Sequence, residues 1–349
     1  MKIKISLISI AALFAVLNML PVSAAQVSCS ALPYTTAPNS SDTCLSLGSA
    51  DPYNAIFRQG TSNIGVLFLH GRGQDPNGDV VRQLRNSLNS DGYTTLSIED
   101  PVPPGGTAFN NYVANETIIQ NQLFLRVELA LAELKSRNVD RVVLAGFSLG
   151  SRFATASAAA WELNQLNTSG LNLIGLLGVG LYSSGPDSTI SNINVLNSIS
   201  NLSFITSIPV LDIYGDNDTP ASTTAAARKA AYAGDNYTQV ELTCPNTSGN
   251  YFVQTATGIV PYYGGTGTTG DTNRCHQLRN GLLFDPVSNS YVPDVVLRGS
   301  PNAPLETTAR NWFASNFALP EPKTWLLVII GLLGMGIVKR HQRGARADG

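Results

Sequence analysis

Apolar positions along the chain follow two alternating patterns. Continuous apolar runs are typical of strands that are buried on both faces of a sheet. Such runs cover residues 64–69, 141–145, 171–181 and 210–214, and we predict two further strands at residues 93–98 and 237–242. Segments with helical character lie between and after them, at residues 79–88, 115–135, 152–161, 222–232 and 305–317. This alternation predicts an α/β fold over residues 61–318: a doubly wound, mostly parallel sheet with helices on both faces.

The segment 26–60 shows no strong periodicity and is polar and rich in turn residues. We expect it to form an N-terminal extension with at most short strands. The chain has four cysteines, which permit three pairings. Pairing between neighbours in the sequence is preferred, which makes Cys29 with Cys44 and Cys244 with Cys275 the candidate disulfides.

The first 25 residues have the pattern of a secretory signal peptide. Lys2 and Lys4 form a short basic start, an apolar run covers residues 5–20, and small residues precede a cleavage site near Ala24 or Ala25. The alternative is an uncleaved membrane anchor. Export would place the cysteines in an oxidising compartment, where disulfides persist.

The segment 319–349 combines three features: the sequence Pro320-Glu321-Pro322, an apolar run over residues 325–338, and a basic end. The run is shorter than the roughly 20 residues of a full membrane span, and the basic end would stay cytoplasmic. A simple tail anchor is one interpretation. Residues 320–343, however, resemble the PEP-CTERM sorting signal of Gram-negative bacteria. That resemblance implies transient anchoring in the inner membrane, processing by an exosortase, and release to the cell surface or extracellular matrix.

The sequence Gly146-Phe147-Ser148-Leu149-Gly150 joins a predicted strand to a predicted helix. This G-x-S-x-G pattern, in that context, is typical of a nucleophile elbow, in which a serine occupies a strained turn at the top of a sheet. Gly146 and Gly150 would leave room for the neighbouring backbone. The alternative interpretation is an ordinary glycine-rich turn between a strand and a helix.

The order of elements around this motif resembles the α/β-hydrolase superfamily over residues 60–317. Residues 68–98 also resemble a bacterial branch of that superfamily whose function is unknown. The resemblance implies a Ser-acid-His triad in that chain order. It assigns Ser148 as nucleophile, and places the acid at Asp218, with Asp216 as the alternative.

Only three histidines are present. His341 lies beyond the apolar C-terminal run, and His70 follows the first core strand, where a buried orienting role is expected. His276 lies between the last predicted strand and the final helix, which makes it the candidate base. A disulfide between Cys244 and Cys275 would hold the loop that carries it.

The resemblance also implies an oxyanion hole made of main-chain N–H groups. These map to Leu149 and Arg72, and Gly71 and Gly73 would let the second loop approach closely. The side chain of Arg72 would contact an anionic substrate or lie in solvent.

The net charge of −2 does not favour a nucleic-acid partner, and no His or Cys cluster has zinc spacing. We therefore expect no metal and no cofactor. The leading hypothesis is an exported serine hydrolase that acts on a small-molecule or polymer ester, or on a peptide or amide. The alternatives are a non-catalytic cell-surface or exopolysaccharide-associated protein with the same fold, and an acyltransferase.

Overall fold

The computed structural model describes residues 24–34, 37–183, 193–216, 218–242, 251–255, 258–261, 282–285, 290–293, 304–317 and 319. The chain divides into two compact units, Met1–Trp312 and Phe313–Gly349. The first unit carries the main sheet and the candidate site. In the second unit, the rings of Phe313 and Phe317 lie 5.4 Å apart.

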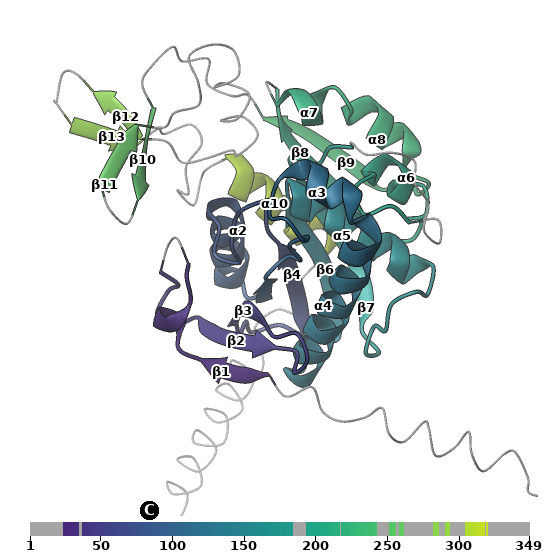
Figure 1. Cartoon of the computed structure of the whole chain (residues 1–349). Helices are drawn as coiled ribbons and strands as arrows, with labels where there is room; N and C mark the ends of the chain where they lie inside the picture. The colour runs from purple at the N-terminus through teal and green to yellow at the C-terminus, as the bar shows by residue number, and fades with distance from the viewer. Residues whose placement is uncertain are drawn as a thin grey trace, which may run out of the picture. The chain divides into compact units, whose positions relative to one another are not determined.

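A nine-stranded sheet forms the centre of the first unit (Figure 1), and its strand order is β1-β2-β3-β5-β4-β6-β7-β8-β9. Its strands are β1 (Ala25–Val27), β2 (Thr43–Leu47), β3 (Tyr53–Arg58), β4 (Ile64–Leu69), β5 (Thr94–Ile98), β6 (Arg141–Phe147), β7 (Asn172–Val179), β8 (Val210–Gly215) and β9 (Tyr237–Leu242). The six strands from β5 to β9 pair in parallel. The mostly parallel α/β sheet is therefore confirmed, and it is consistent with the α/β-hydrolase fold.

Three antiparallel strands extend this sheet within the segment that we expected to be an extension. β1 pairs with β2, β2 with β3, and β3 with β5. Most residues of β2 and β3 are buried, so these strands contribute to the core. Each strand is short and lies among prolines and turn residues, so the sequence shows no clear strand pattern here.

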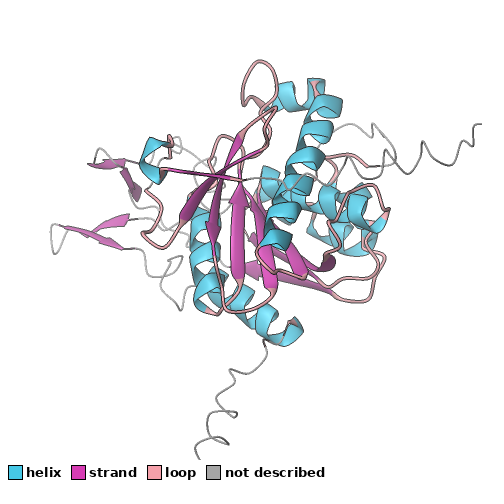
Figure 2. Ribbon diagram, turned by 90° about the horizontal axis from the view of Figure 1, so that it is seen from below, coloured by secondary structure: helices cyan, strands magenta, loops and turns pink. Residues whose placement is uncertain are grey.

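Helices cover both faces of the sheet, as Figure 2 shows. On one face, α4 (Glu116–Ser136) and α5 (Leu149–Glu162) pack in one apolar cluster with Leu67 and Leu69 of β4. Val66 and Phe68 point to the opposite face because side chains alternate along a strand. There α2 (Asp79–Ser90) contacts β4, β5 and β6. The remaining described helices are η1 (Cys29–Ala31), α3 (Phe109–Ala114), α6 (Ser198–Leu202), α7 (Thr219–Ser222), α8 (Ala225–Ala231) and α10 (Pro304–Asn316).

A second, antiparallel sheet has the order β11-β10-β12-β13. Its strands are β10 (Tyr251–Thr255), β11 (Gly258–Pro261), β12 (Leu282–Asp285) and β13 (Ser290–Pro293). We did not predict it, because strands of four or five residues leave little periodicity within a stretch rich in glycine and threonine.

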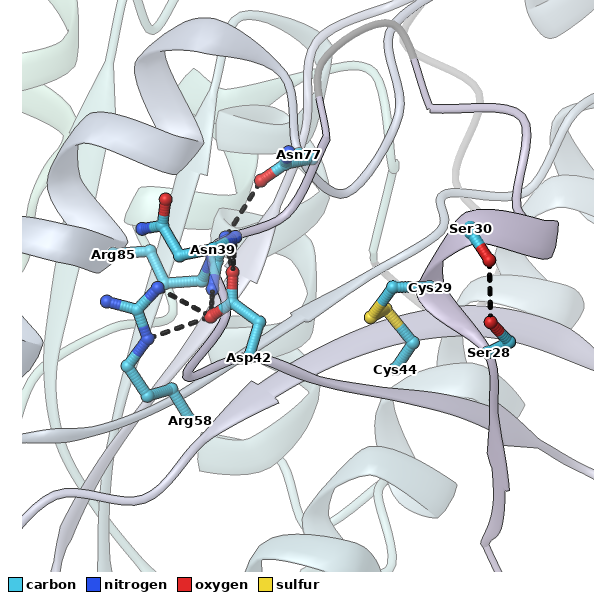
Figure 3. The surroundings of a disulfide bond; sticks show 9 residues. All are labelled: Ser28, Cys29, Ser30, Asn39, Asp42, Cys44, Arg58, Asn77 and Arg85. Carbon is cyan, nitrogen blue, oxygen red and sulfur yellow. Dashed lines mark hydrogen bonds and ion pairs between the residues drawn. A yellow bond between two sulfur atoms is a disulfide. The ribbon is translucent and has the colours of Figure 1, made fainter.

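The Cys29–Cys44 disulfide is confirmed, with Cα atoms 5.3 Å apart (Figure 3). It joins η1 to β2. The other candidate pair, Cys244 and Cys275, lies outside the described residues, as do the predicted signal peptide before residue 24 and the apolar run 325–338. Within the described ranges, no helix is both long enough and apolar enough to cross a membrane.

A buried ionic cluster lies near this disulfide (Figure 3). The Asp42 carboxylate accepts hydrogen bonds from Arg58 Nε at 2.8 Å and from Arg85 Nη1 at 2.5 Å. Arg85 also donates to the Asn77 side-chain oxygen at 2.8 Å. Burial raises the pKa of Asp42, but the bonds and charges of the two arginines outweigh it and hold that pKa below its ordinary value. The cluster therefore fastens the start of β2 to β3, α2 and the loop that follows β4.

Candidate active site

Ser148 occupies a strained turn between β6 and α5. Its backbone angles are φ 55° and ψ −116°, a conformation that residues with a Cβ rarely adopt. The Ser148 N–H donates to the carbonyl oxygen of Val179 at 2.8 Å, which fastens the turn to the end of β7. Strain of this kind persists only where the surrounding structure holds it, and it clusters at functional sites.

The two glycines of the motif are required by close backbone contacts. A Cβ atom on Gly146 would lie 2.2 Å from the carbonyl oxygen of Gly150, and one on Gly150 would lie 2.3 Å from that of Leu69. Neither obstacle is a flexible side chain, so any larger residue would force the backbone to move. The elbow strand, the start of α5 and the end of β4 therefore touch one another directly.

The loop after β4 lies against this elbow. A Cβ on Gly71 would come within 2.9 Å of the Phe147 ring, and Gly73 has a φ of 71°, which favours glycine. These contacts explain why glycine is needed at both positions. They also place Arg72 next to the elbow. The main-chain N–H of Arg72 is the group that we predicted for the oxyanion hole.

His70 fixes the start of that loop. Its Nδ1 lies 2.9 Å from the carbonyl oxygen of Gly71, and its Nε2 lies 3.0 Å from the N–H of Asp100. In a neutral ring with the proton on Nδ1, both nitrogens are used: the first donates and the second accepts. The side chain is buried. The geometry is therefore that of an orienting residue, as we predicted for His70.

Asp100, two residues after β5, has a fully buried carboxyl group close to His70. Burial raises the pKa of Asp100 to about 7, and the charge of Arg126 acts against that shift. One oxygen lies 3.9 Å from His70 Nδ1. This buried carboxyl group could not be predicted, because an aspartate before a proline suggests an ordinary turn.

The end of β8 presents the candidate acids. Asp218 is fully buried, whereas Asp216 is partly exposed and its N–H continues the ladder to Leu242 at 3.0 Å. Asp212, inside the strand, accepts bonds from Arg228, Tyr237 and Gln239 at 2.8–2.9 Å. Those partners give Asp212 a structural role and leave the two later aspartates as candidates.

Ser148 and Asp218 follow strands β6 and β8, which are separated by β7 alone. Because these strands are parallel, both residues lie at the same edge of the sheet. They are about 10 Å apart, measured across the strands within the sheet. Leu149 begins α5, so its N–H is one of those left without a partner within the helix. His276 lies outside the described residues. The assembled triad and the oxyanion hole stay predictions.

Arg152 is a feature of this edge that the sequence did not reveal. It lies in the first turn of α5, is fully buried, and donates from Nη1 to the Leu196 carbonyl oxygen at 3.3 Å. Its guanidinium carbon lies 3.4 Å from the centre of the Tyr182 ring. An arginine after a G-x-S-x-G motif looks like a solvated helix residue, and only the fold buries it. Among the described residues, no group of three or more His, Cys, Asp or Glu side chains could hold a metal ion.

No protein-family model and no curated protein matches the chain. Similar solved structures include a lidless α/β serine hydrolase from Xanthomonas campestris, at 16% identity and a TM-score of 0.41, covering 61% of this chain and 87% of that one. A dienelactone hydrolase from Anabaena variabilis has 19% identity and a TM-score of 0.38, covering 64% of this chain and 87% of that one. An arylesterase has 13% identity and a TM-score of 0.42, covering 62% and 79%.

These structural neighbours are hydrolases, but none is similar enough to assign this chain to a family. We therefore base the function on the chemistry of the elbow and its surroundings.

Proposed function

We propose that the protein is an exported serine hydrolase that cleaves esters through an acyl-enzyme. The observation that supports it most strongly is the strained Ser148, held between two glycines that admit no side chain. Such a turn costs free energy, and an ordinary connection between a strand and a helix has no need of it. As a nucleophile elbow it exposes the serine hydroxyl beside main-chain N–H groups.

The chemistry follows from these positions. His276 removes the proton from the Ser148 hydroxyl as its oxygen attacks the ester carbon, and Asp218 holds the imidazole. The N–H groups of Leu149 and Arg72 stabilise the negative oxygen that forms. The C–O bond to the alcohol then breaks, and the alcohol leaves with the proton from His276. Water repeats the sequence on the acyl-enzyme and releases the acid.

The location outside the cytoplasm is part of the proposal. The residues before 24 and after 319 would direct export and anchoring, and processing by an exosortase would release the protein to the cell surface or matrix. The Cys29–Cys44 disulfide supports an oxidising compartment.

Hydrolysis of p-nitrophenyl esters by the oxidised protein tests the proposal. We expect Ser148→Ala and His276→Ala each to lower kcat by about 10⁴ or more, because either change removes the acyl-enzyme route. Asp216→Asn is the matched control for Asp218→Asn, and only the second is expected to lower kcat strongly. Equal activity of the wild type and Ser148→Ala would refute the proposed nucleophile.

A further inference from the structure

Two arginines converge on one aromatic ring beside the elbow. The guanidinium carbon of Arg72 lies 5.9 Å from the centre of the Phe109 ring, and that of Arg152 lies 5.2 Å from the same centre. Phe109 is the first residue of α3. Cations at these distances are attracted by the face of the ring, although one ring does not neutralise two charges.

The positive charge of Arg152 is held there against several unfavourable effects. Burial, which is the larger cause, and the nearby charge of Arg72 together lower the pKa of Arg152 to about 10. The residue also lies in the first turn of α5, where the helix dipole disfavours a cation. The stacked Tyr182 ring and the Leu196 carbonyl oxygen are among the contacts that offset these costs.

Arg72, in contrast, is exposed, and within the described part of the chain it forms no ion pair. Its loop touches the start of α5, because a Cβ on Gly150 would meet the carbonyl oxygens of both Leu69 and His70 at 2.3 and 2.4 Å. Arg152 lies about one helical turn beyond Ser148. The main chains of Arg72 and Arg152 therefore both lie close to Ser148, and their guanidinium groups meet at the Phe109 ring.

We propose that this protein selects esters that carry an anionic group, such as a carboxylate, near the bond to be cleaved. Arg72 would bind that group directly, since an exposed guanidinium offers a fork of donors that fits a carboxylate. Arg152 would act as a fixed positive charge behind it and raise the local concentration of anions. This inference rests on the proposed hydrolase function and specifies its substrate class.

Two pairs of esters test the proposal. The first compares p-nitrophenyl hemiglutarate with p-nitrophenyl hexanoate, which places the charge in the acyl part. The second compares 3-acetoxybenzoate with phenyl acetate, which places it in the alcohol part. The rate measured with Ser148→Ala is subtracted from each rate, so that only hydrolysis that depends on Ser148 is compared. We expect the wild type to prefer the anionic member of at least one pair in kcat/KM, and that preference to weaken as salt screens the charges.

Arg72→Gln should lower the ratio of anionic to neutral kcat/KM by about tenfold, as expected for the loss of a hydrogen bond to a charged group. Arg137→Gln is the matched control, because Arg137 also faces a phenylalanine ring, 4.6 Å from the centre of Phe57, but follows α4 near the opposite edge of the sheet. It should leave the ratio unchanged.

The two possible failures are distinguishable. Hydrolysis of neutral esters with no anionic preference in either pair, or a ratio that Arg72→Gln leaves unchanged, would overturn the substrate class alone. Absence of any Ser148-dependent hydrolysis of all four esters would count against the hydrolase itself.

Discussion

At the scale of single residues, the chemistry of this chain depends on how closely the backbone segments pack around Ser148. The motif was readable from the sequence, because glycine, serine and glycine at fixed spacing have few other uses between a strand and a helix. The unusual environments of Arg152 and Asp100 could not be predicted from the sequence. Both are charged residues that the fold buries, and the sequence does not show which charged residues are buried. Asp100 follows β5 and Arg152 follows β6 and the elbow, and these parallel strands end at the same edge of the sheet.

Gly150→Ala should lower both stability and activity. The new methyl would lie 2.3 Å from the Leu69 carbonyl oxygen, and overpacking of this kind costs about 1–3 kcal/mol or more. Gly170→Ala is the control: its φ is 70°, but nothing lies within 4 Å of an added Cβ. It should cost only the left-handed penalty of about 1–2 kcal/mol and leave activity intact. Chemical denaturation and ester hydrolysis measure the two effects, and equal losses in both variants would contradict the contact.

The buried carboxyl of Asp100 should make stability depend on pH. Its pKa is raised by burial from an ordinary value of 3.8 to about 7, so the folded state holds the proton more tightly than the unfolded state does. This stabilisation is complete below about pH 4 and is lost as pH rises to about 7. Three pH units correspond to about 4 kcal/mol.

Asp100→Asn removes that titration. The free energy of unfolding of the wild type minus that of the variant should fall between pH 4 and 7 and then level off. Burial also raises the pKa of Glu306 to about 7, so Glu306 makes stability depend on pH in the same range. Both proteins contain Glu306, so the difference between their free energies of unfolding removes its contribution. A flat difference across this range would show that Asp100 does not titrate as described.

At the scale of elements, the Asp42 cluster explains how three antiparallel strands join the sheet. The sequence suggested an extension here, because each strand is short and lies among turn residues. The disulfide was predictable from the closeness of Cys29 and Cys44 in the chain. The partners of Asp42 were not, since Arg58 and Arg85 come from β3 and α2.

Asp42→Asn should lower the free energy of unfolding by about 3–5 kcal/mol, because it removes the negative charge that pairs with two arginines. Side chains of Asp42 and Arg85 are fully buried, so water cannot replace the lost partner. Asp140→Asn is the control, because Asp140 pairs with Lys135 in solvent and should change stability little. Urea denaturation compares them, and similar losses in both variants would contradict the role of burial.

At the scale of the whole molecule, the parallel part of the sheet followed from the sequence and the rest did not. The inner parallel strands are buried on both faces, and the continuous apolar runs of β4, β6 and β8 stand out in the sequence. The antiparallel strands β1, β2 and β3 bury fewer residues than the inner parallel strands, and the strands of the second sheet have only four or five residues, so both give weaker patterns. The same limit applies to the site, whose nucleophile lies in a strong motif while its charged surroundings come from distant segments.

Covalent labelling tests the central claim most directly. The oxidised protein is treated with a fluorophosphonate, which reacts with an activated serine, and the modified residue is located by mass spectrometry. We predict a single adduct on Ser148, lost in Ser148→Ala and strongly slowed in His276→Ala. Absence of an adduct on Ser148 in the folded, oxidised protein would contradict the assignment of a serine hydrolase.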